Sequence, residues 1–304
     1  MAQTTNTHRP LDPKTAKVGF IGIGNMGEPM AAHLIKAGWD VQVYDTDADK
    51  VRRFTAAHGG SAAAGLEAMG QRSNAIVTML PDGHIVRKVV LEGADCLAKG
   101  LARGSVIIDM SSSAPVGTRE LGAELAERGI GLVDAPVSGG VKGAVNAALT
   151  IMVGGDGALV QAVDPLLAPM GKRFQAGSLG SAHAVKVLNN YVSAAGLAAA
   201  AEAVLIARRF GVDPQTVINI INASSGRNNS TENKFAQFIL NRKFSSGFSL
   251  GLMAKDIGLA MEVAKACKVE AELGHACLAL WKEAETELGG KVDHTEVVRH
   301  IGED

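Results

Sequence analysis

The spacing of hydrophobic residues changes once along the chain, near residue 180. Before that point, short apolar runs rich in β-branched residues alternate with segments in which apolar residues recur at helical spacing. Alternation of this kind predicts strands joined by helices, and hence a mainly parallel sheet. After that point, apolar residues recur at helical spacing alone. We therefore predict a Rossmann-type α/β domain followed by an all-α domain.

The ends of the predicted elements are marked by glycine, proline or serine. Strands are predicted at 17–23, 39–44, 75–80, 105–110, 131–136, 149–153 and 172–175. Helices are predicted at 28–37, 180–210, 214–222, 232–240, 249–267, 273–288 and 292–301. Two further helices are predicted to end at residue 128 and at about residue 170. The chain is thus expected to have a disordered leader at 1–16, an α/β domain at 17–179, and an all-helical domain at 180–304. The long helix 180–210 joins the two domains.

The long helix carries almost no charge in its middle. Between Ala182 and Ala207 the only Lys or Arg is Lys186 and the only carboxylate is Glu202. A helix that is apolar on all sides is usually buried on several of them, and a buried ammonium group is unfavourable unless something uses it. Asn190 follows Lys186 by one turn, so both side chains leave the same face. This pair is a candidate for chemistry; the alternative is a lysine that extends to the surface near a helix start.

A glycine-rich turn connects the first predicted strand to the first predicted helix. It reads GIGNMG, and the next strand ends at an acidic residue, Asp45. This order is the dinucleotide-binding pattern, in which Gly22 permits a tight turn, Gly24 lets the backbone approach a pyrophosphate, and Gly27 lets helix and strand pack closely. The alternative is a glycine turn in a fold without a dinucleotide. The residues expected at the cofactor turn are Gly22, Gly24, Asn25, Met26, Gly27 and Asp45.

The residue after the second strand bears on the choice of cofactor. Asp45 lies 23 positions after Gly22 and is followed by Thr46 and Asp47, not by arginine. A carboxylate at this position accepts hydrogen bonds from the adenosine ribose and repels a 2′-phosphate. The sequence therefore favours NAD over NADP.

Two later strands end in loops that we expect at the same edge of the sheet. Leu80 and Pro81 end one strand, and the run Ser111–Ser113 ends the next. Ligands of doubly wound sheets bind beyond the carboxyl ends of the strands, so Leu80, Pro81 and Ser112 are candidate cofactor contacts. A proline that stops the strand and a serine that caps the next helix are the alternative.

A third loop has the composition of an anion site. After the strand at 131–136 the chain reads Val137-Ser138-Gly139-Gly140. A serine followed by two glycines leaves backbone N–H groups available to a carboxylate. We expect Ser138, Gly139 and Gly140 to bind an anion such as a carboxylate.

Composition excludes several other classes. The 304 residues carry a net charge of −1 and only 4% aromatic residues, which argues against a nucleic-acid partner. Three scattered cysteines indicate neither a disulfide framework nor a zinc site, and no other metal ligand cluster is evident. The N-terminus lacks a secretory signal, and we see no run of 18 apolar residues that would span a membrane. A cytoplasmic protein without membrane or metal partners is expected.

The residues resemble those of the β-hydroxyacid dehydrogenases, the family of 3-hydroxyisobutyrate dehydrogenase and tartronate semialdehyde reductase. The resemblance extends over nearly the whole chain from Lys17. It rests on four motifs in the family's order: VGFIGIGNMGEPMAAHL, DAPVSGGVKGA, GSLGSAHAVKVLNN and LMAKDIGLA.

The resemblance implies roles for residues that match these motifs. Lys186 is similar to the family's catalytic lysine, and Asn190 to the asparagine that holds the substrate beside it. The Ser138–Gly140 loop is similar to the one that binds the substrate carboxylate. Lys255 is similar to a second family lysine, which reaches the active site from the C-terminal domain. We expect Lys255 to contact the cofactor. Ser112 occupies the position that touches the nicotinamide side of the cofactor.

Some positions depart from the family pattern. Family members that use NADP tend to carry Asn-Arg-Thr where this chain has Asp45-Thr46-Asp47, in agreement with NAD. His183 stands where many members have glutamine, and we expect it to be a packing residue or one that supports the site residues, not a proton carrier. The loop 225–233 differs from the tryptophan-containing loop of 3-hydroxyisobutyrate dehydrogenases, which weakens the case for that particular substrate. In the polar segment 224–230, Arg227, Asn228 and Asn229 either form a surface turn or select a substrate tail.

The expected activity is NAD-dependent interconversion of a small, 3-hydroxyisobutyrate-like β-hydroxyacid and its semialdehyde. Lys186 would take the hydroxyl proton during oxidation and return it during reduction. Alternatives are a reductase that works mainly with NADH, an oxidative decarboxylase, an imine reductase, and a NAD-binding sensor without turnover. Retention of Lys186 beside Asn190 argues against the last two. A homodimer or homotetramer is expected, because long apolar helices usually find a partner surface.

Overall fold

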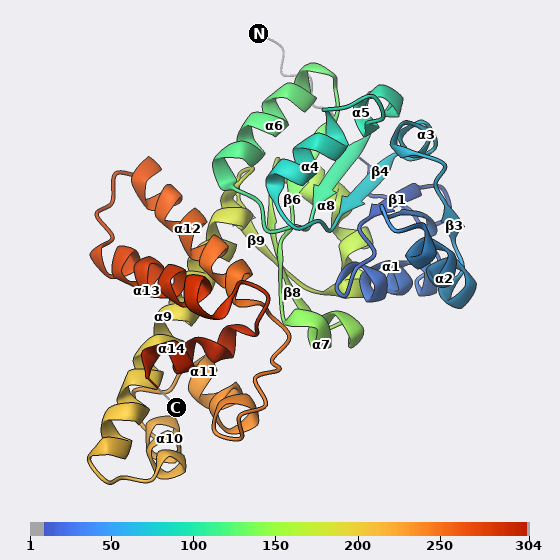
Figure 1. Ribbon diagram of the computed structural model, residues 1–304. Helices are drawn as coiled ribbons and strands as arrows, with labels where there is room; N and C mark the ends of the chain where they lie inside the picture. Colours follow the sequence, from blue (N-terminus) through green and yellow to red (C-terminus); the bar gives the residue numbers. More distant parts are fainter. Residues whose placement is uncertain (1–8, 303–304) are drawn as a thin grey trace. The chain divides into compact units, whose positions relative to one another are not determined.

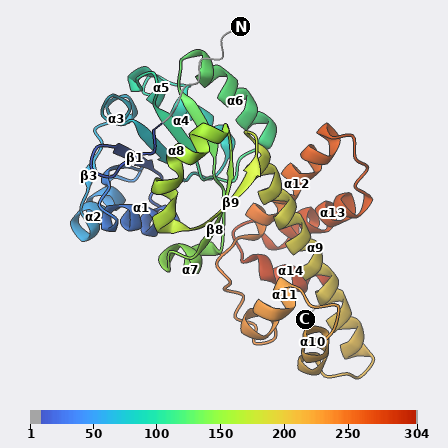
Figure 2. The ribbon, with the colours of Figure 1, turned by 180° about the vertical axis from the view of Figure 1, so that it is seen from behind.

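The computed structural model describes residues 9–302 and divides into two compact units. The first unit runs up to Lys186 and the second begins at Val187, so the division falls inside one long helix. In the first unit a sheet has helices on both faces, and the second unit is built of helices (Figures 1 and 2). This confirms the predicted fold class, a Rossmann-type domain followed by an all-α domain and joined by a long helix.

The sheet has nine strands in the order β3-β2-β1-β4-β5-β6-β8-β7, with β9 paired to β8. The strands are β1 (Lys17–Ile21), β2 (Asp40–Tyr44), β3 (Ser61–Ala62), β4 (Ala75–Thr78), β5 (Val106–Asp109), β6 (Gly131–Asp134), β7 (Val137–Ser138), β8 (Leu149–Gly154) and β9 (Gly171–Gly177). From β3 to β6 all neighbours are parallel. Strand β1 has β2 on one side and β4 on the other. In such sheets the ligand crevice lies at this reversal of strand order, beyond the carboxyl ends.

The helices of the first unit cover both faces of the sheet (Figures 1 and 2). They are α1 (Gly27–Lys36), α2 (Ala48–His58), α3 (Leu66–Arg72), α4 (Gly83–Val90), α5 (Leu97–Gly100), α6 (Pro115–Glu127), α7 (Gly140–Val145) and α8 (Gly157–Leu167), followed by a 3-10 turn, Ala168–Met170. Apolar residues of α1, α2 and α8 share one core cluster with the sheet, and those of α3, α4, α5 and α6 share another.

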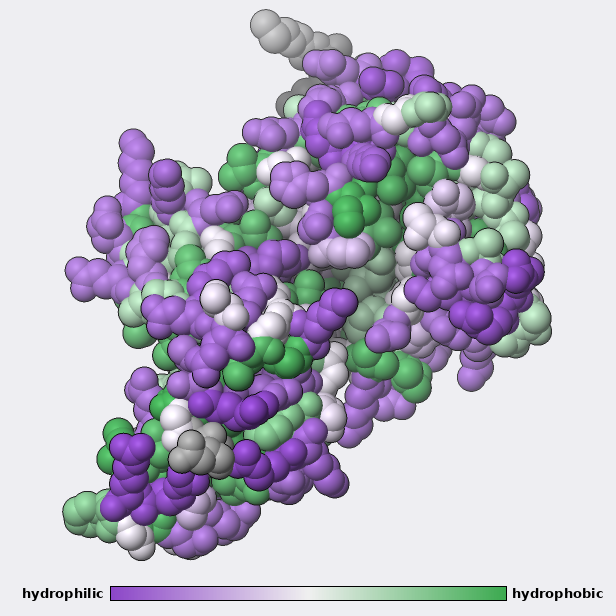
Figure 3. Space-filling model, viewed as in Figure 1, coloured by the Kyte–Doolittle hydropathy of each residue, from purple (hydrophilic) through white to green (hydrophobic). Residues whose placement is uncertain are grey.

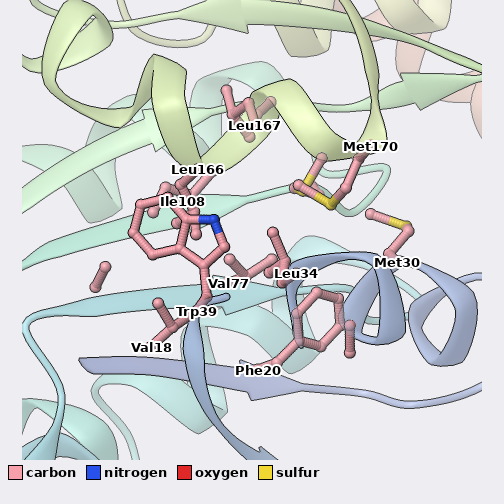
Figure 4. Packing of buried hydrophobic residues seen from close by; sticks show 14 of the residues in the cluster. Val18, Phe20, Met30, Leu34, Trp39, Val77, Ile108, Leu166, Leu167 and Met170 are labelled. Atoms are coloured by element: carbon pink, nitrogen blue, oxygen red, sulfur yellow. The ribbon is translucent and has the colours of Figure 1, made fainter. Parts of the chain in front are cut away.

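The strands supply both cores by alternation. Val18 and Phe20 of β1 point into the cluster with α1 and α8, whereas Ile21 joins the opposite cluster. Figure 4 shows Trp39 packed among apolar side chains of one core, such as Leu166. On the surface, by contrast, hydrophilic residues cover most of the molecular face seen in Figure 3. A sheet buried on both faces explains why its strands read as continuous apolar runs in the sequence.

The glycine turn between β1 and α1 has little room for side chains at two of its three glycines. Gly22 has a φ of +91°, and a Cβ there would lie 2.3 Å from the Met79 carbonyl oxygen. A Cβ on Gly27 would lie 1.8 Å from the Gly22 carbonyl oxygen. A Cβ on Gly24, by contrast, would meet nothing within 4 Å. Gly22 and Gly27 are therefore required by the fold, and Gly24 faces open space.

Strands β6 and β7 form one interrupted partner of β8. Asp134 pairs with Gly154 and Ser138 pairs with Thr150, both antiparallel and in the same register. Between them Met152 N donates to Pro136 O at 3.0 Å. The ladder therefore holds the chain rigid up to Ser138, where the predicted anion loop begins.

The long helix α9 (Ser181–Arg209) begins beside the end of β6. The Asp134 carboxylate is fully buried, and it accepts hydrogen bonds from Gly180 N and His183 N, each at 2.9 Å. These N–H groups belong to the first turn of α9, which no preceding helical turn can satisfy. A buried carboxylate at a helix N-terminus is also favoured by the helix dipole. Asp134 thus fixes where α9 starts on the sheet.

The second unit packs its helices around Trp281, which is fully buried. Its helices after α9 are α10 (Pro214–Asn222), α11 (Asn229–Asn233), α12 (Leu250–Ala266), α13 (Glu272–Leu288) and α14 (Val297–Ile301), with a π-helical turn, Phe235–Ile239, and a 3-10 turn, His294–Glu296. The small residues Ala194, Ala200 and Ala201 of α9 lie in this core. Alanine lets the other helices approach α9 closely.

Two predicted segments differ from the observed elements. The segment after Ser138 was expected to be a loop, but Gly140 starts the short helix α7; its glycines gave no helical signal. The helix predicted at 232–240 is divided into α11 and the π-helical turn. The Asn228 side chain caps α11, so that this helix begins three residues earlier than predicted.

The expectation of a disordered leader is wrong for its last residues; residues 1–8 lie outside the described part of the chain. Leu11 N donates to Ala162 O at 2.8 Å, and Ala16 is 3% exposed. The Asp12 side chain accepts a hydrogen bond from Lys14 N and closes a turn between them. Apolar contacts with α8 therefore order this segment.

One helix in the described part of the chain is long and apolar enough to span a membrane by length and composition, which the apolar runs in the sequence did not indicate. Helix α9 has 29 residues and an 18-residue window with a mean hydropathy of 1.4. Length and composition alone are weak evidence, because core helices of soluble proteins have the same properties, and 39% of that window is buried inside the protein.

The glycine turn predicts opposite effects for two alanine substitutions. Gly27→Ala forces a Cβ against the Gly22 carbonyl and should lower the melting temperature by several degrees. Gly24→Ala should leave the melting temperature unchanged but weaken binding of the predicted dinucleotide, because a Cβ there would enter the open space where we expect its pyrophosphate. Thermal unfolding and NAD titration by fluorescence measure the two effects. NAD binding by Gly24→Ala as tight as in the wild type would refute this assignment.

The cap on α9 predicts a large effect of a small substitution. In Asp134→Asn an amide nitrogen replaces one acceptor, so one buried N–H loses its partner and the charge is lost. We expect the free energy of unfolding to fall by about 2–3 kcal/mol, measured by urea denaturation. Asp156→Asn is the matched control, because Asp156 caps α8 at an exposed position, where asparagine is an equally good cap. An equal, small loss in both variants would contradict the role of Asp134.

Candidate functional site

Three loops meet the switch point of the sheet at the carboxyl ends of β1, β4 and β5. They are the glycine turn at 22–27, the segment Leu80–Pro81, and Ser111–Ser113. Leu80 N donates to Ser111 Oγ at 2.9 Å, which ties the second loop to the third. The predicted cofactor residues Leu80, Pro81 and Ser112 therefore lie in adjoining loops. Gly24, Asn25 and Met26 occupy the turn, with Asn25 exposed.

Asp45 follows β2 and holds the glycine turn. One carboxylate oxygen accepts from Ile23 N at 3.0 Å, and the other accepts from Asp47 N at 3.0 Å. Each carboxylate oxygen has a second lone pair, so the same group has the capacity to accept ribose hydroxyls. Together with the open side of Gly24, this arrangement fits the adenosine end of a dinucleotide.

The predicted anion loop is held between two elements. Gly139 has a φ of +123° and Gly140 a φ of +59°, and both residues are exposed. Such left-handed conformations favour glycine and turn the chain from β7 into α7. His33 of α1 donates from Nε2 to the carbonyl oxygens of Ala144 at 3.0 Å and Val145 at 3.1 Å. Helix α1 therefore anchors the end of α7, so the cofactor turn and the anion loop are joined to the same helix.

Lys186 lies in the second turn of α9 and is 9% exposed. One turn earlier, His183 is fully buried, and its Nε2 donates to Ser111 O at 3.1 Å. Its Nδ1 shares a hydrogen bond of 2.8 Å with Thr118 Oγ1 of α6. His183 is thus a packing residue, as expected, and it ties the helix that carries Lys186 to the serine loop after β5.

A buried aspartate, Asp109, holds that serine loop by hydrogen bonds. One oxygen of Asp109 accepts from Thr78 Oγ1 at 2.9 Å and from Ser111 N at 3.0 Å, and the other accepts from Ser113 Oγ at 2.7 Å. The second oxygen also lies 3.7 Å from His183 Nε2. Asp109, Asp134 and His183 therefore form one polar network beneath the loop and the start of α9. Ser113 caps no helix here, because its hydroxyl donates to Asp109.

Asn190 and Lys255 belong to the second unit. Asn190 Nδ2 donates to Asp256 Oδ2 at 2.6 Å, and both side chains are buried. Lys255 Nζ lies 3.3 Å from Asp256 Oδ1 and is partly exposed. Asp256 of α12 thus orients the amide of Asn190 on α9. Sequence reasoning did not single out Asp256, although it follows Lys255 in a quoted motif.

The polar segment 224–230 has a clear structural use for one residue. The Asn228 side chain accepts from Ser230 N at 2.8 Å and Thr231 N at 3.1 Å, and donates to Gly196 O at 3.3 Å. Asn228 therefore caps α11 and attaches it to α9. Arg227 is exposed and lies 3.6 Å from Glu232. Within residues 9–302, no group of three or more His, Cys, Asp or Glu residues is placed to hold a metal ion.

The roles of the candidate residues stay predictions. Sequence reasoning missed the aspartates beneath the site, Asp109 and Asp134. The available signal was position: each is the last residue of a buried strand, at the edge where ligands bind.

Comparison with known proteins identifies both halves of the chain. Residues 17–180 match the model described as the NAD binding domain of 6-phosphogluconate dehydrogenase. Residues 180–301 match the model described as NAD-binding of NADP-dependent 3-hydroxyisobutyrate dehydrogenase. The two matches meet at the residue before α9.

Named relatives cover most of the chain. A 2-(hydroxymethyl)glutarate dehydrogenase of Eubacterium barkeri is 40% identical over 83% of this chain and 83% of its own length. A NAD-dependent L-serine dehydrogenase of Pseudomonas aeruginosa is 36% identical over 88% of this chain and 91% of its own. The mitochondrial 3-hydroxyisobutyrate dehydrogenase of Rattus norvegicus is 35% identical over 97% and 90%.

Solved structures show the same arrangement. The 3-hydroxyisobutyrate dehydrogenase of Mycobacterium tuberculosis with L-serine has a TM-score of 0.86 and 32% identity, and the match covers 95% of this chain and 99% of that one. With both family models matched and relatives of this identity along the chain, the protein belongs to the β-hydroxyacid dehydrogenase family and is an oxidoreductase with a dinucleotide-binding Rossmann domain.

Proposed function

We propose that the protein interconverts a small β-hydroxyacid and its semialdehyde with NAD, and that Lys186 is the general acid and base. The observation that carries this proposal is the setting of Lys186. Its side chain is 9% exposed in the second turn of α9, whose first turn is fixed by Asp134 and His183. A lysine held in this way is available for proton transfer at one defined place. Relatives named for L-serine and 3-hydroxyisobutyrate support the substrate class.

The cofactor would lie across the switch point of the sheet. Gly24 leaves room for the pyrophosphate, and Asp45 accepts the ribose hydroxyls. Leu80, Pro81 and Ser112 would line the side toward the nicotinamide, with Lys255 contacting the cofactor from α12. When bound, NAD supplies the acceptor for the hydride that leaves the hydroxyl-bearing carbon.

The remaining residues would hold the substrate and move one proton. Backbone N–H groups of Ser138, Gly139 and Gly140 would bind the carboxylate. Asn190, oriented by Asp256, has a second amide N–H for the substrate hydroxyl oxygen. Lys186, in its neutral form, would take the hydroxyl proton as the carbonyl forms. In the reductive direction the same lysine, as the ammonium, would return it.

NAD is the proposed cofactor because of Asp45. The carboxylate stands where a 2′-phosphate of NADP would approach, and two like charges repel. The named L-serine dehydrogenase relative is NAD-dependent. We further propose a homo-oligomer, because Val192 and Ile206 of α9 and Phe210, which directly follows it, are exposed by 67%, 69% and 88%, as expected of an apolar contact surface.

Cofactor choice is tested by Asp45→Asn. Loss of the charge should raise KM for NAD roughly 10-fold and reduce discrimination against NADP by a similar factor. Asp49→Asn is the control, because Asp49 is exposed on α2 and pairs with Arg52. Steady-state kinetics with both cofactors provides the measurement. A wild-type preference for NADP would show that Asp45 does not select NAD.

The chemistry is tested by Lys186→Met, which keeps the length of the side chain and removes the amine. Turnover of a β-hydroxyacid should fall at least ~100-fold while NAD affinity stays within about a factor of two. Lys88→Met, at an exposed position on α4, should behave as the wild type. The assignment fails if Lys186→Met retains near wild-type turnover.

A further inference from the structure

A second lysine of the helical unit, Lys234, is partly buried and lies close to α9, the helix that carries Asn190. Lys234 follows α11, is only partly exposed, and its backbone N donates to Ser230 O at 2.9 Å. The next residue, Phe235, is 1% exposed and anchors the chain in the core. At the other end of α11, the Asn228 side chain caps the helix N-terminus. The backbone therefore fixes Lys234, and its side chain reaches Ser193 on α9.

The ammonium group of Lys234 has few acceptors in the protein. Its Nζ donates to Ser193 Oγ at 3.4 Å, a long hydrogen bond. Within residues 9–302, no carboxylate comes within 4.0 Å of it. The nearby Asp293 carboxylate is already engaged, since it accepts from Ser246 Oγ, Gly247 N and Thr295 Oγ. An ammonium has three donors, so most of this group's hydrogen-bonding capacity remains for a ligand.

At neutral pH the Lys234 side chain carries a positive charge, whereas the neighbouring His294 does not. Burial lowers its pKa to about 8, while Asp293 opposes that shift, so the side chain is mostly protonated at pH 7. Burial, aided by the charge of Lys234, lowers the pKa of His294 to about 4. His294 is therefore neutral, with Nδ1 donating to Phe248 O at 3.1 Å. A single partly buried cation without a close counter-ion is unfavourable unless an anion joins it.

The position of Ser193 relates this cation to the proposed site. Ser193 follows Asn190 by three residues on α9, so both side chains leave the same face of the helix. Along the axis they are about 4.5 Å apart. If Asn190 holds the reacting hydroxyl, Lys234 meets the part of the substrate that lies about one helical turn away.

We propose that Lys234 binds a second carboxylate of the substrate, so that the enzyme prefers β-hydroxyacids that carry an acidic arm over those that carry an alkyl group. The inference rests on the proposed function, because Asn190 locates the reacting end. The arm must span about one helical turn, ~5 Å, which two methylene groups and a carboxylate achieve.

Two substrates with the same reacting end test the proposal. In 2-(hydroxymethyl)glutarate and 3-hydroxyisobutyrate the same carbon carries a hydroxymethyl group and a carboxylate, and the third substituent is a carboxyethyl arm or a methyl group. The wild type should show the lower KM for the diacid. Lys234→Met should raise that KM about 10- to 100-fold with kcat nearly unchanged. It should leave kcat/KM for the monoacid unchanged.

Two further variants separate charge from structure. Lys234→Arg should retain the preference for the diacid, because it keeps a positive charge. Lys243→Met removes an exposed lysine of the same unit and should alter neither substrate's kinetics. Lys234→Gln serves if the methionine variant does not fold.

The possible outcomes separate the role of Lys234 from the proposed function. Equal losses for both substrates would show a structural role for Lys234, and no loss for either would show that it contacts no substrate; each result overturns the proposal. Oxidation of the monoacid without any preference for the diacid also overturns it, while the proposed function stands. Oxidation of neither substrate removes the proposed function, and this inference with it.

Discussion

The buried carboxylate of Asp134 decides where the long helix begins. It ends β6 and satisfies the N–H groups of Gly180 and His183, so a strand of the sheet and the first turn of α9 are held by charge-assisted hydrogen bonds. His183 then reaches Ser111 in the loop after β5. Because α9 is one continuous helix, fixing its first turn also fixes the place of Lys186 relative to that loop. The proposed chemistry depends on this placement more than on any contact nearer the surface.

Hydrogen bonds also hold the loops on the side of the proposed cofactor site. Helix α1 starts at the glycine turn and, through His33, also holds the end of α7, which follows the proposed carboxylate loop. Asp45 holds the glycine turn through Ile23 N. The glycine turn and the helix that follows the proposed carboxylate loop are thus each held by hydrogen bonds to a neighbouring element. In the helical unit Asp256 does the same for Asn190.

The sequence predicted what depends on local spacing, and missed what depends on topology. The alternation around β1, the GIGNMG turn and the alanine-rich course of α9 are local patterns, and the fold class followed from them. The network of Asp109, Asp134 and His183 joins residues that are far apart in the chain, so no local pattern contains it. The order of residues 11–16 and the short helix α7 were missed because tertiary contacts, not helical or strand spacing, stabilise them. Lys234 gave no signal, since a single lysine after a polar loop usually lies at the surface.

The central claim is that a hydride passes between the hydroxyl-bearing carbon of a β-hydroxyacid and NAD. The most direct measurement uses L-serine, 3-hydroxyisobutyrate and 2-(hydroxymethyl)glutarate, each deuterated at the hydroxymethyl carbon, with mass spectrometry of the cofactor after turnover. For the substrate that the enzyme oxidises, the account predicts one deuterium in the reduced cofactor and none exchanged with water. Reduced cofactor without the label, or no reduced cofactor from any of the three, would contradict it.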